Sequence, residues 1–172
     1  MLFRSIGEMD ADGSHQPEQL QRLLVGLRDA DLVIGSRWVP GGSVVNWPWQ
    51  RELLSRGGNL YVRVLLGIGV RDATAGYRLF RRSTLERIRL DEVRSTGYVF
   101  QTDLVTRTLQ AGLTVREVPI EFVERVRGES KMSGQVALES LKRITWWGLR
   151  QRWHAVKGHS QVTSPRELQQ TR

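Results

Sequence analysis

The segment MDADGSHQPEQLQRLLVGLRDADLVIGSR, residues 9–37, carries most of the information about the fold. It begins with an acidic turn, and Pro17 suits the first turn of a helix, where a missing backbone N–H costs nothing. Apolar residues then recur at helical spacing, at Leu20, Leu23, Leu24 and Leu27. Residues 31–36 form a short apolar run typical of a buried strand. A helix that leads directly into a buried strand favours the α/β class.

The rest of the chain continues this alternation. Helical patterns span residues 50–66, 83–88 and 100–110, with Ser83 expected to cap the second helix and Gly112 to stop the third. Gly57 and Gly58 either weaken the first of these helices or mark a close helix contact. Residues 114–123 predict an edge strand because Pro119 cannot donate to a sheet. We expect one domain over residues 1–153 that ends in an amphipathic helix, followed by a polar, disordered tail at 154–172.

Composition excludes several classes of function. The chain has 172 residues and a formal net charge of +8, with no cysteine, so disulfides, thiolate nucleophiles and cysteine-based metal sites are excluded. No apolar run reaches the 18 residues of a membrane span. The apolar stretch at the amino terminus is too short and too charged for a signal peptide, which favours a cytoplasmic location for the protein. The basic charge suits a nucleic-acid module, but the cations are scattered and no nucleic-acid motif accompanies them.

Asp10 and Asp12 are the first candidate site. In an extended segment, carboxylates two residues apart point to the same side and can share one divalent cation. Oxygen ligands of this kind select Mg²⁺ or Mn²⁺. The alternative is a solvated acidic turn ahead of a helix, because Asp, Gly and Ser are ordinary residues at helix starts.

Five segments together resemble one family. They are DADGSHQPE (10–18), DATAGYRLFRR (72–82), GYVFQTD (97–103), VPIEFVER (118–125) and RGESKM (127–132). In this order they are similar to motifs of family-two glycosyltransferases, in particular the dolichyl-phosphate and polyprenyl-phosphate mannose synthases. The resemblance implies a GT-A fold, a Rossmann-like α/β fold of nucleotide-sugar transferases. The nucleotide-binding part that such enzymes carry first has no counterpart before Glu8, so we expect an amino-terminally truncated domain that requires a partner chain or the missing half.

The resemblance also implies an activity. A chain of this family is expected to transfer mannose from GDP-mannose to polyprenyl or dolichyl phosphate, while bound peripherally at the cytoplasmic face of a membrane. Asp10 would lie beside the ribose and the diphosphate, and Asp12 would bind Mg²⁺ or Mn²⁺ directly. Ser14 stands where some relatives offer a further metal ligand. The alternative is an inactive fragment that acts as a basic module on membranes or nucleic acid.

Further residues take roles from the same resemblance. Arg37, at the end of a predicted strand, would face the donor diphosphate or the acceptor phosphate, although it could instead stack on Trp38 or Trp47. Arg78 would bind the acceptor phosphate.

Gln101 and Asp103 match an element at the start of a helix. Gln101 is expected to bind the donor, and Asp103 to orient reacting groups, because a phosphate acceptor is already ionised and needs no base. The alternative for Asp103 is a first-turn carboxylate that complements the helix dipole.

A basic loop and the last predicted helix complete the expected site. Arg127, Ser130 and Lys131 lie in a glycine-containing loop that resembles the clamp on the lipid phosphate. The helix expected at 135–153 carries basic residues and tryptophans, which suits either an anionic membrane surface or packing on the sheet.

Overall fold

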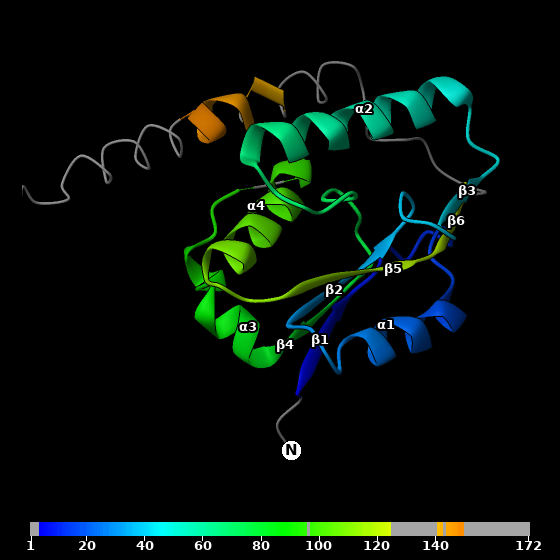
Figure 1. Cartoon of the computed structure of the whole chain (residues 1–172). Coiled ribbons are helices and arrows are strands. Elements are labelled where there is room, and N and C mark those ends of the chain that lie inside the picture. The colour runs from blue at the N-terminus through cyan, green and yellow to red at the C-terminus, as the bar shows by residue number, and fades with distance from the viewer. Residues whose placement is uncertain (1–3, 96, 125–140, 143, 150–172) are drawn as a thin grey trace, which may run out of the picture.

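The computed structural model describes residues 4–95, 97–124, 141–142 and 144–149 (Figure 1). Its centre is a four-stranded mixed sheet in the order β1-β4-β2-β5. Strand β4 runs antiparallel to β1 and β2, whereas β2 and β5 are parallel. The four strands are β1 (Ser5–Glu8), β4 (Arg78–Arg81), β2 (Leu32–Ser36) and β5 (Val115–Pro119).

Helices cover both faces of this sheet. In Figure 1, α1 lies on one side, and α2 and α4 lie on the other. A two-stranded parallel sheet, β3 with β6, extends one end of the molecule. The remaining elements are η1 (Pro17–Gln19), α1 (Leu20–Gly26), β3 (Ser43–Val45), α2 (Trp49–Leu66), α3 (Arg82–Arg87), η2 (Leu90–Glu92), α4 (Gly97–Gln110) and β6 (Glu121–Val123). None of these described helices is long and apolar enough to cross a bilayer.

Side-chain alternation along β2 divides the core into two layers. Leu32 and Ile34 face the layer that contains α2 and α4, and Val33 faces the layer that contains α1. All five residues of β2 are buried, as expected for a central strand covered on both faces. The predicted α/β class is therefore confirmed.

Several predicted elements are confirmed. Pro17 opens the helical segment, β2 coincides with the predicted buried run, and α2 is continuous through Gly57 and Gly58. A Cβ added at either glycine would meet nothing within 4 Å, so neither marks a close contact among the described residues. Such a contact occurs instead at Gly148, where a Cβ would lie 2.8 Å from Cγ of Leu65.

Other predictions were wrong at element boundaries. Strand β1 was not predicted, and α4 begins at Gly97, three residues before the expected start. Helix α3 begins at Arg82 with Arg81 at the N-cap and no side-chain cap, so Ser83 does not cap it. The single strand expected at 114–123 is two strands, because the chain leaves the main sheet at Pro119 and pairs with β3 as β6. The edge position of β5 was predicted correctly.

Candidate functional site

The loop after β1 holds Asp10 and Asp12 in a turn. Residues 11–14 form a bend with Gly13 at φ 80°, so the extended geometry expected for the two carboxylates is wrong. Oδ1 of Asp12 accepts hydrogen bonds from the backbone N–H of Ser14 at 3.1 Å and from its hydroxyl at 2.5 Å. The side chain of Asp10 is 59% exposed. The loop thus fixes Asp12 and leaves the Asp10 carboxylate facing solvent.

His15 supports this loop from behind. It is 3% exposed, and its Nδ1 accepts a hydrogen bond from the backbone N–H of Asp10 at 3.1 Å. Its ring packs 5.1 Å from the rings of Tyr77 and Phe122. Burial lowers the pKa of His15, which favours the neutral imidazole that this hydrogen bond needs. His15 therefore orders the acidic turn.

The acidic turn carries carboxylate oxygens, the type of ligand that hard divalent cations prefer. No group of three His, Cys, Asp or Glu side chains arranged to hold a metal occurs among the residues described. Mg²⁺ usually binds through one or two carboxylates and completes its shell with substrate phosphates and water. Asp12 and Asp10 supply such a set. Ser14 is 1% exposed and directs its hydroxyl at Asp12, so in this structure it orients that carboxylate.

Arg37, immediately after β2, is held in a buried ion pair. Its Nε and Nη2 donate to Oδ2 and Oδ1 of Asp72 at 2.8 and 2.7 Å, and Asp72 is fully buried. The guanidinium also lies 5.4 to 5.5 Å from the ring centres of Trp38, Trp47 and Phe122. The stacking predicted as an alternative is confirmed. We call the rings of Trp38, Trp47 and Phe122 around Arg37 the aromatic cage. That Arg37 faces a phosphate stays a prediction.

Arg78 is enclosed within the domain. It is 0% exposed, and its guanidinium donates to the backbone carbonyls of Ala73, Ala75 and Gln101 at 2.6 to 2.7 Å. Burial lowers the pKa of Arg78 to about 10, so it stays protonated at neutral pH. The expectation that Arg78 binds the acceptor phosphate is therefore not supported. The residue instead joins the loop after Asp72 to the start of α4.

Gln101 and Asp103 point to different parts of the molecule. Nε2 of Gln101 donates to Glu8 at 2.5 Å, at the end of β1 that leads into the acidic turn. Asp103 accepts hydrogen bonds from Ser95 and Arg107, each at 2.7 Å. The structure therefore brings Gln101 near the Asp10 loop but does not bring Asp103 there. Glu8 was missed by the sequence analysis, although its position two residues before Asp10 was a usable signal.

Comparisons with known proteins agree with this arrangement. Residues 5–89, which contain the acidic turn, Arg37 and Asp72, match the model of Glycosyl transferase family 2. The chain carries a glycosyltransferase family 2 domain. Its mixed sheet with helices on both faces is consistent with the GT-A fold that the resemblance implied.

Two relatives of this glycosyltransferase domain are mannosyltransferases. The chain is 56% identical over 150 residues to the undecaprenyl-phosphate mannosyltransferase of Micrococcus luteus. The aligned residues are 87% of this chain and 62% of that enzyme. It is 54% identical over 152 residues to the polyprenol monophosphomannose synthase of Mycolicibacterium smegmatis, covering 88% of this chain and 57% of that enzyme. The chain thus spans about three fifths of the length of these relatives.

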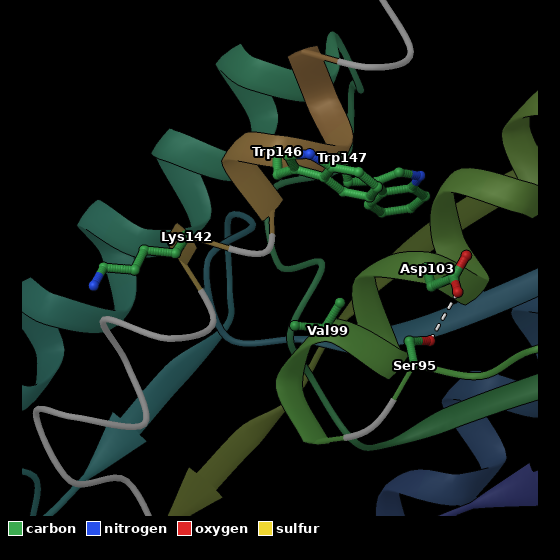
Figure 2. A pocket seen from close by; sticks show the side chains of 6 residues that line it. All are labelled: Ser95, Val99, Asp103, Lys142, Trp146 and Trp147. Carbon is green, nitrogen blue, oxygen red and sulfur yellow. Dashed lines mark hydrogen bonds between the residues drawn. The ribbon is translucent and has the colours of Figure 1, made fainter.

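A largely apolar cavity lies between α4 and the helical segment 144–149. It has a volume of about 500 Å³ and is lined by Ser95, Val99, Asp103, Lys142, Trp146 and Trp147. Figure 2 shows the two indoles above the Ser95–Asp103 hydrogen bond. Asp103 therefore belongs to this cavity in the glycosyltransferase domain.

Part of the predicted site falls outside the described residues. These are Arg127, Ser130 and Lys131 of the basic loop, together with most of the helix expected at 135–153 and the tail at 154–172. Their predicted roles stay predictions.

Proposed function

We propose that this chain takes part in the synthesis of polyprenyl-phosphate mannose, by transfer of mannose from GDP-mannose to polyprenyl or dolichyl phosphate. The observation that carries the proposal is the identity of 54 to 56% with two enzymes named for this activity, over almost nine tenths of the chain. The carboxylates of the acidic turn suit a cation that binds a diphosphate leaving group, and the positive charge of Arg37 suits a phosphate acceptor.

The proposed reaction is one displacement at the anomeric carbon of mannose. An oxygen of the acceptor phosphate forms the new bond to that carbon as the bond to the GDP oxygen breaks. The phosphate is already ionised, so no side chain has to remove a proton, and positioning carries the reaction. Asp12 and Asp10 would hold Mg²⁺ or Mn²⁺, which neutralises charge on the departing diphosphate when bound. Gln101 and Glu8, at the entry to the same turn, would face the donor.

The acceptor requirement tests this proposal. A polyprenyl phosphate is expected to accept labelled mannose from GDP-mannose, whereas the corresponding polyprenol is not, because the alcohol would need a general base that this mechanism lacks. The measurement is organic-phase label with each acceptor at equal concentration. Equal labelling of the alcohol would contradict the direct attack by phosphate.

We also propose that α2 lies against the membrane that contains the acceptor. Its residues Trp49, Leu53, Leu60 and Val64 are 58 to 69% exposed, and their spacing places them on one stripe of the helix. The helical segment 144–149 lies beside α2 in Figure 1, and the hydroxyl oxygens of Tyr61 and Thr145 are 2.5 Å apart. This segment adds Trp146 and Leu149, which are 64% and 58% exposed. An amphipathic surface of this kind suits the bilayer interface.

Vesicle binding tests the membrane proposal. The double substitution Leu53→Ser with Leu60→Ser is expected to weaken binding to phosphatidylglycerol vesicles by at least about tenfold, because two leucine side chains no longer enter the bilayer. Leu24→Ser, at a 41% exposed position on α1, is the matched control and should bind as the wild type does. Co-sedimentation that is the same for all three proteins would refute this surface.

A further inference from the structure

Helix α2 carries one buried polar residue that points into the domain. Asn59 is 3% exposed, whereas Leu60 beside it is 58% exposed. Nδ2 of Asn59 donates to the backbone carbonyl of Ser55 at 3.0 Å and lies 3.1 Å from the hydroxyl of Thr74 and 3.4 Å from Oδ1 of Asp72, which is the longest of the three contacts. Asn59 thus contacts the carboxylate that holds Arg37.

The contact closes a small network around Arg37. The backbone N–H of Arg37 donates to Oδ2 of Asp72 at 3.0 Å, in addition to the two guanidinium bonds. Nη2 of Arg37 also lies 3.4 Å from the Thr74 hydroxyl that Asn59 reaches. A buried carboxylate keeps one orientation when donors surround both its oxygens. Asn59 is the donor in this network that comes from α2.

Helix α2 reaches the Arg37 cage at two further points. The Arg51 guanidinium lies 4.1 Å from the ring centre of Trp47, and that of Arg56 lies 4.4 Å from the ring centre of Trp38. The guanidinium of Arg37 lies over the same two indoles. One helix therefore supplies a donor to the carboxylate that pairs with Arg37 and a cation over each tryptophan of the cage.

Asn59 does not have the environment of a residue kept for stability alone. Its Oδ1 is buried and has no hydrogen-bond partner among the described residues, which is unfavourable for folding. An alanine at this position would remove the donor and the unsatisfied carbonyl together. We therefore expect Asn59→Ala to change the stability of the domain little.

We propose that Asn59 is a positioning residue that sets the orientation of Arg37 through Asp72, and so joins the membrane-facing helix to the phosphate-facing arginine. The role given to Arg37 in binding phosphate rests on the proposed function. The link from Asn59 to Arg37 rests on the contacts alone. Through this link, the orientation of Arg37 in the proposed acceptor site depends on α2.

The first test measures Arg37 directly. The Nε–H of Arg37, identified in heteronuclear NMR spectra by its loss in Arg37→Lys, should be protected from solvent exchange by Asp72. Asn59→Ala is expected to raise the exchange rate of this Arg37 proton by about tenfold. Asn59→Ser keeps a donor hydroxyl, so its exchange rate should lie between those of the wild type and Asn59→Ala. Gln50→Ala, at an exposed position on the same helix, is the matched control and should leave the rate unchanged. An unchanged exchange rate in both Asn59 variants would overturn the proposal.

The second test uses farnesyl phosphate as a soluble polyprenyl phosphate. Asn59→Ala is expected to weaken its binding by about tenfold in the wild-type background and hardly at all in Arg37→Lys, because Asn59 acts through Arg37. Equal weakening in both backgrounds would overturn the positioning role. If the exchange rate responds but the wild type does not bind farnesyl phosphate, the link between Asn59 and Arg37 stands and the proposed acceptor is refuted.

Discussion

Arg78→Met is expected to lower the free energy of unfolding by at least about 2 kcal/mol, because two buried carbonyl groups and one partly buried carbonyl group lose their donor and each buried unsatisfied acceptor costs about 1 to 3 kcal/mol. These carbonyls belong to Ala73, Ala75 and Gln101, so the loss separates the loop after Asp72 from α4. Urea denaturation followed by circular dichroism measures the effect. The stability of Arg78→Lys should fall between those of the wild type and Arg78→Met, since an ammonium reaches fewer of the three oxygens.

The matched control is Arg82→Met. Arg82 pairs with Glu86 on the surface at 2.8 Å, an exposed i,i+4 pair, and its loss should cost no more than about 0.5 kcal/mol. If Arg78→Met unfolds like this control and instead loses only binding of polyprenyl phosphate, the original expectation for Arg78 is right and the structural role is wrong.

Asp12→Asn is expected to reduce Mn²⁺ binding below detection. Asparagine keeps an oxygen that can accept the two hydrogen bonds from Ser14, so the turn is retained while the negative charge is lost. Hard divalent cations depend on that charge. Titration calorimetry of the wild type and the variant measures the difference.

Asp91→Asn, an exposed carboxylate in η2, is the matched control and should bind Mn²⁺ like the wild type. Equal heats for the wild type and Asp12→Asn would remove the acidic turn as the metal site. Asp10→Asn should have a smaller effect, since the Asp10 carboxylate is solvated and its backbone, held by His15, is unchanged.

The elements with clear periodicity were predictable from the sequence. Strand β2 is a continuous apolar run, and α2 repeats its apolar residues with helical period, so both were found with nearly the observed bounds. Strand β1 has four residues with no alternation of apolar and polar side chains, and it becomes a strand by pairing with β4. That pairing is a long-range contact, which local pattern does not record.

Some features of the candidate site were also predictable from the sequence, whereas others depend on tertiary contacts. The spacing of Asp10 and Asp12 identified a candidate metal turn, but its geometry depends on Ser14 and His15. The resemblance made Arg78 a phosphate ligand, whereas its contacts show that it donates to backbone carbonyls. For Gln101 and Asp103 the sequence held more than we used, because residues two apart in a helix differ by about 200° and cannot face one ligand.

The most direct measurement of the central claim is the transfer of mannose to lipid. Membranes from cells that express the complete reading frame encoding this chain are incubated with radiolabelled GDP-mannose, a polyprenyl phosphate and Mg²⁺ or Mn²⁺, and label is counted in the organic phase. We expect a mannolipid that is formed by the wild type, lost with EDTA and lost in Asp12→Asn. Wild-type membranes that form no labelled lipid above the host background, or an Asp12→Asn variant as active as the wild type, would contradict the account.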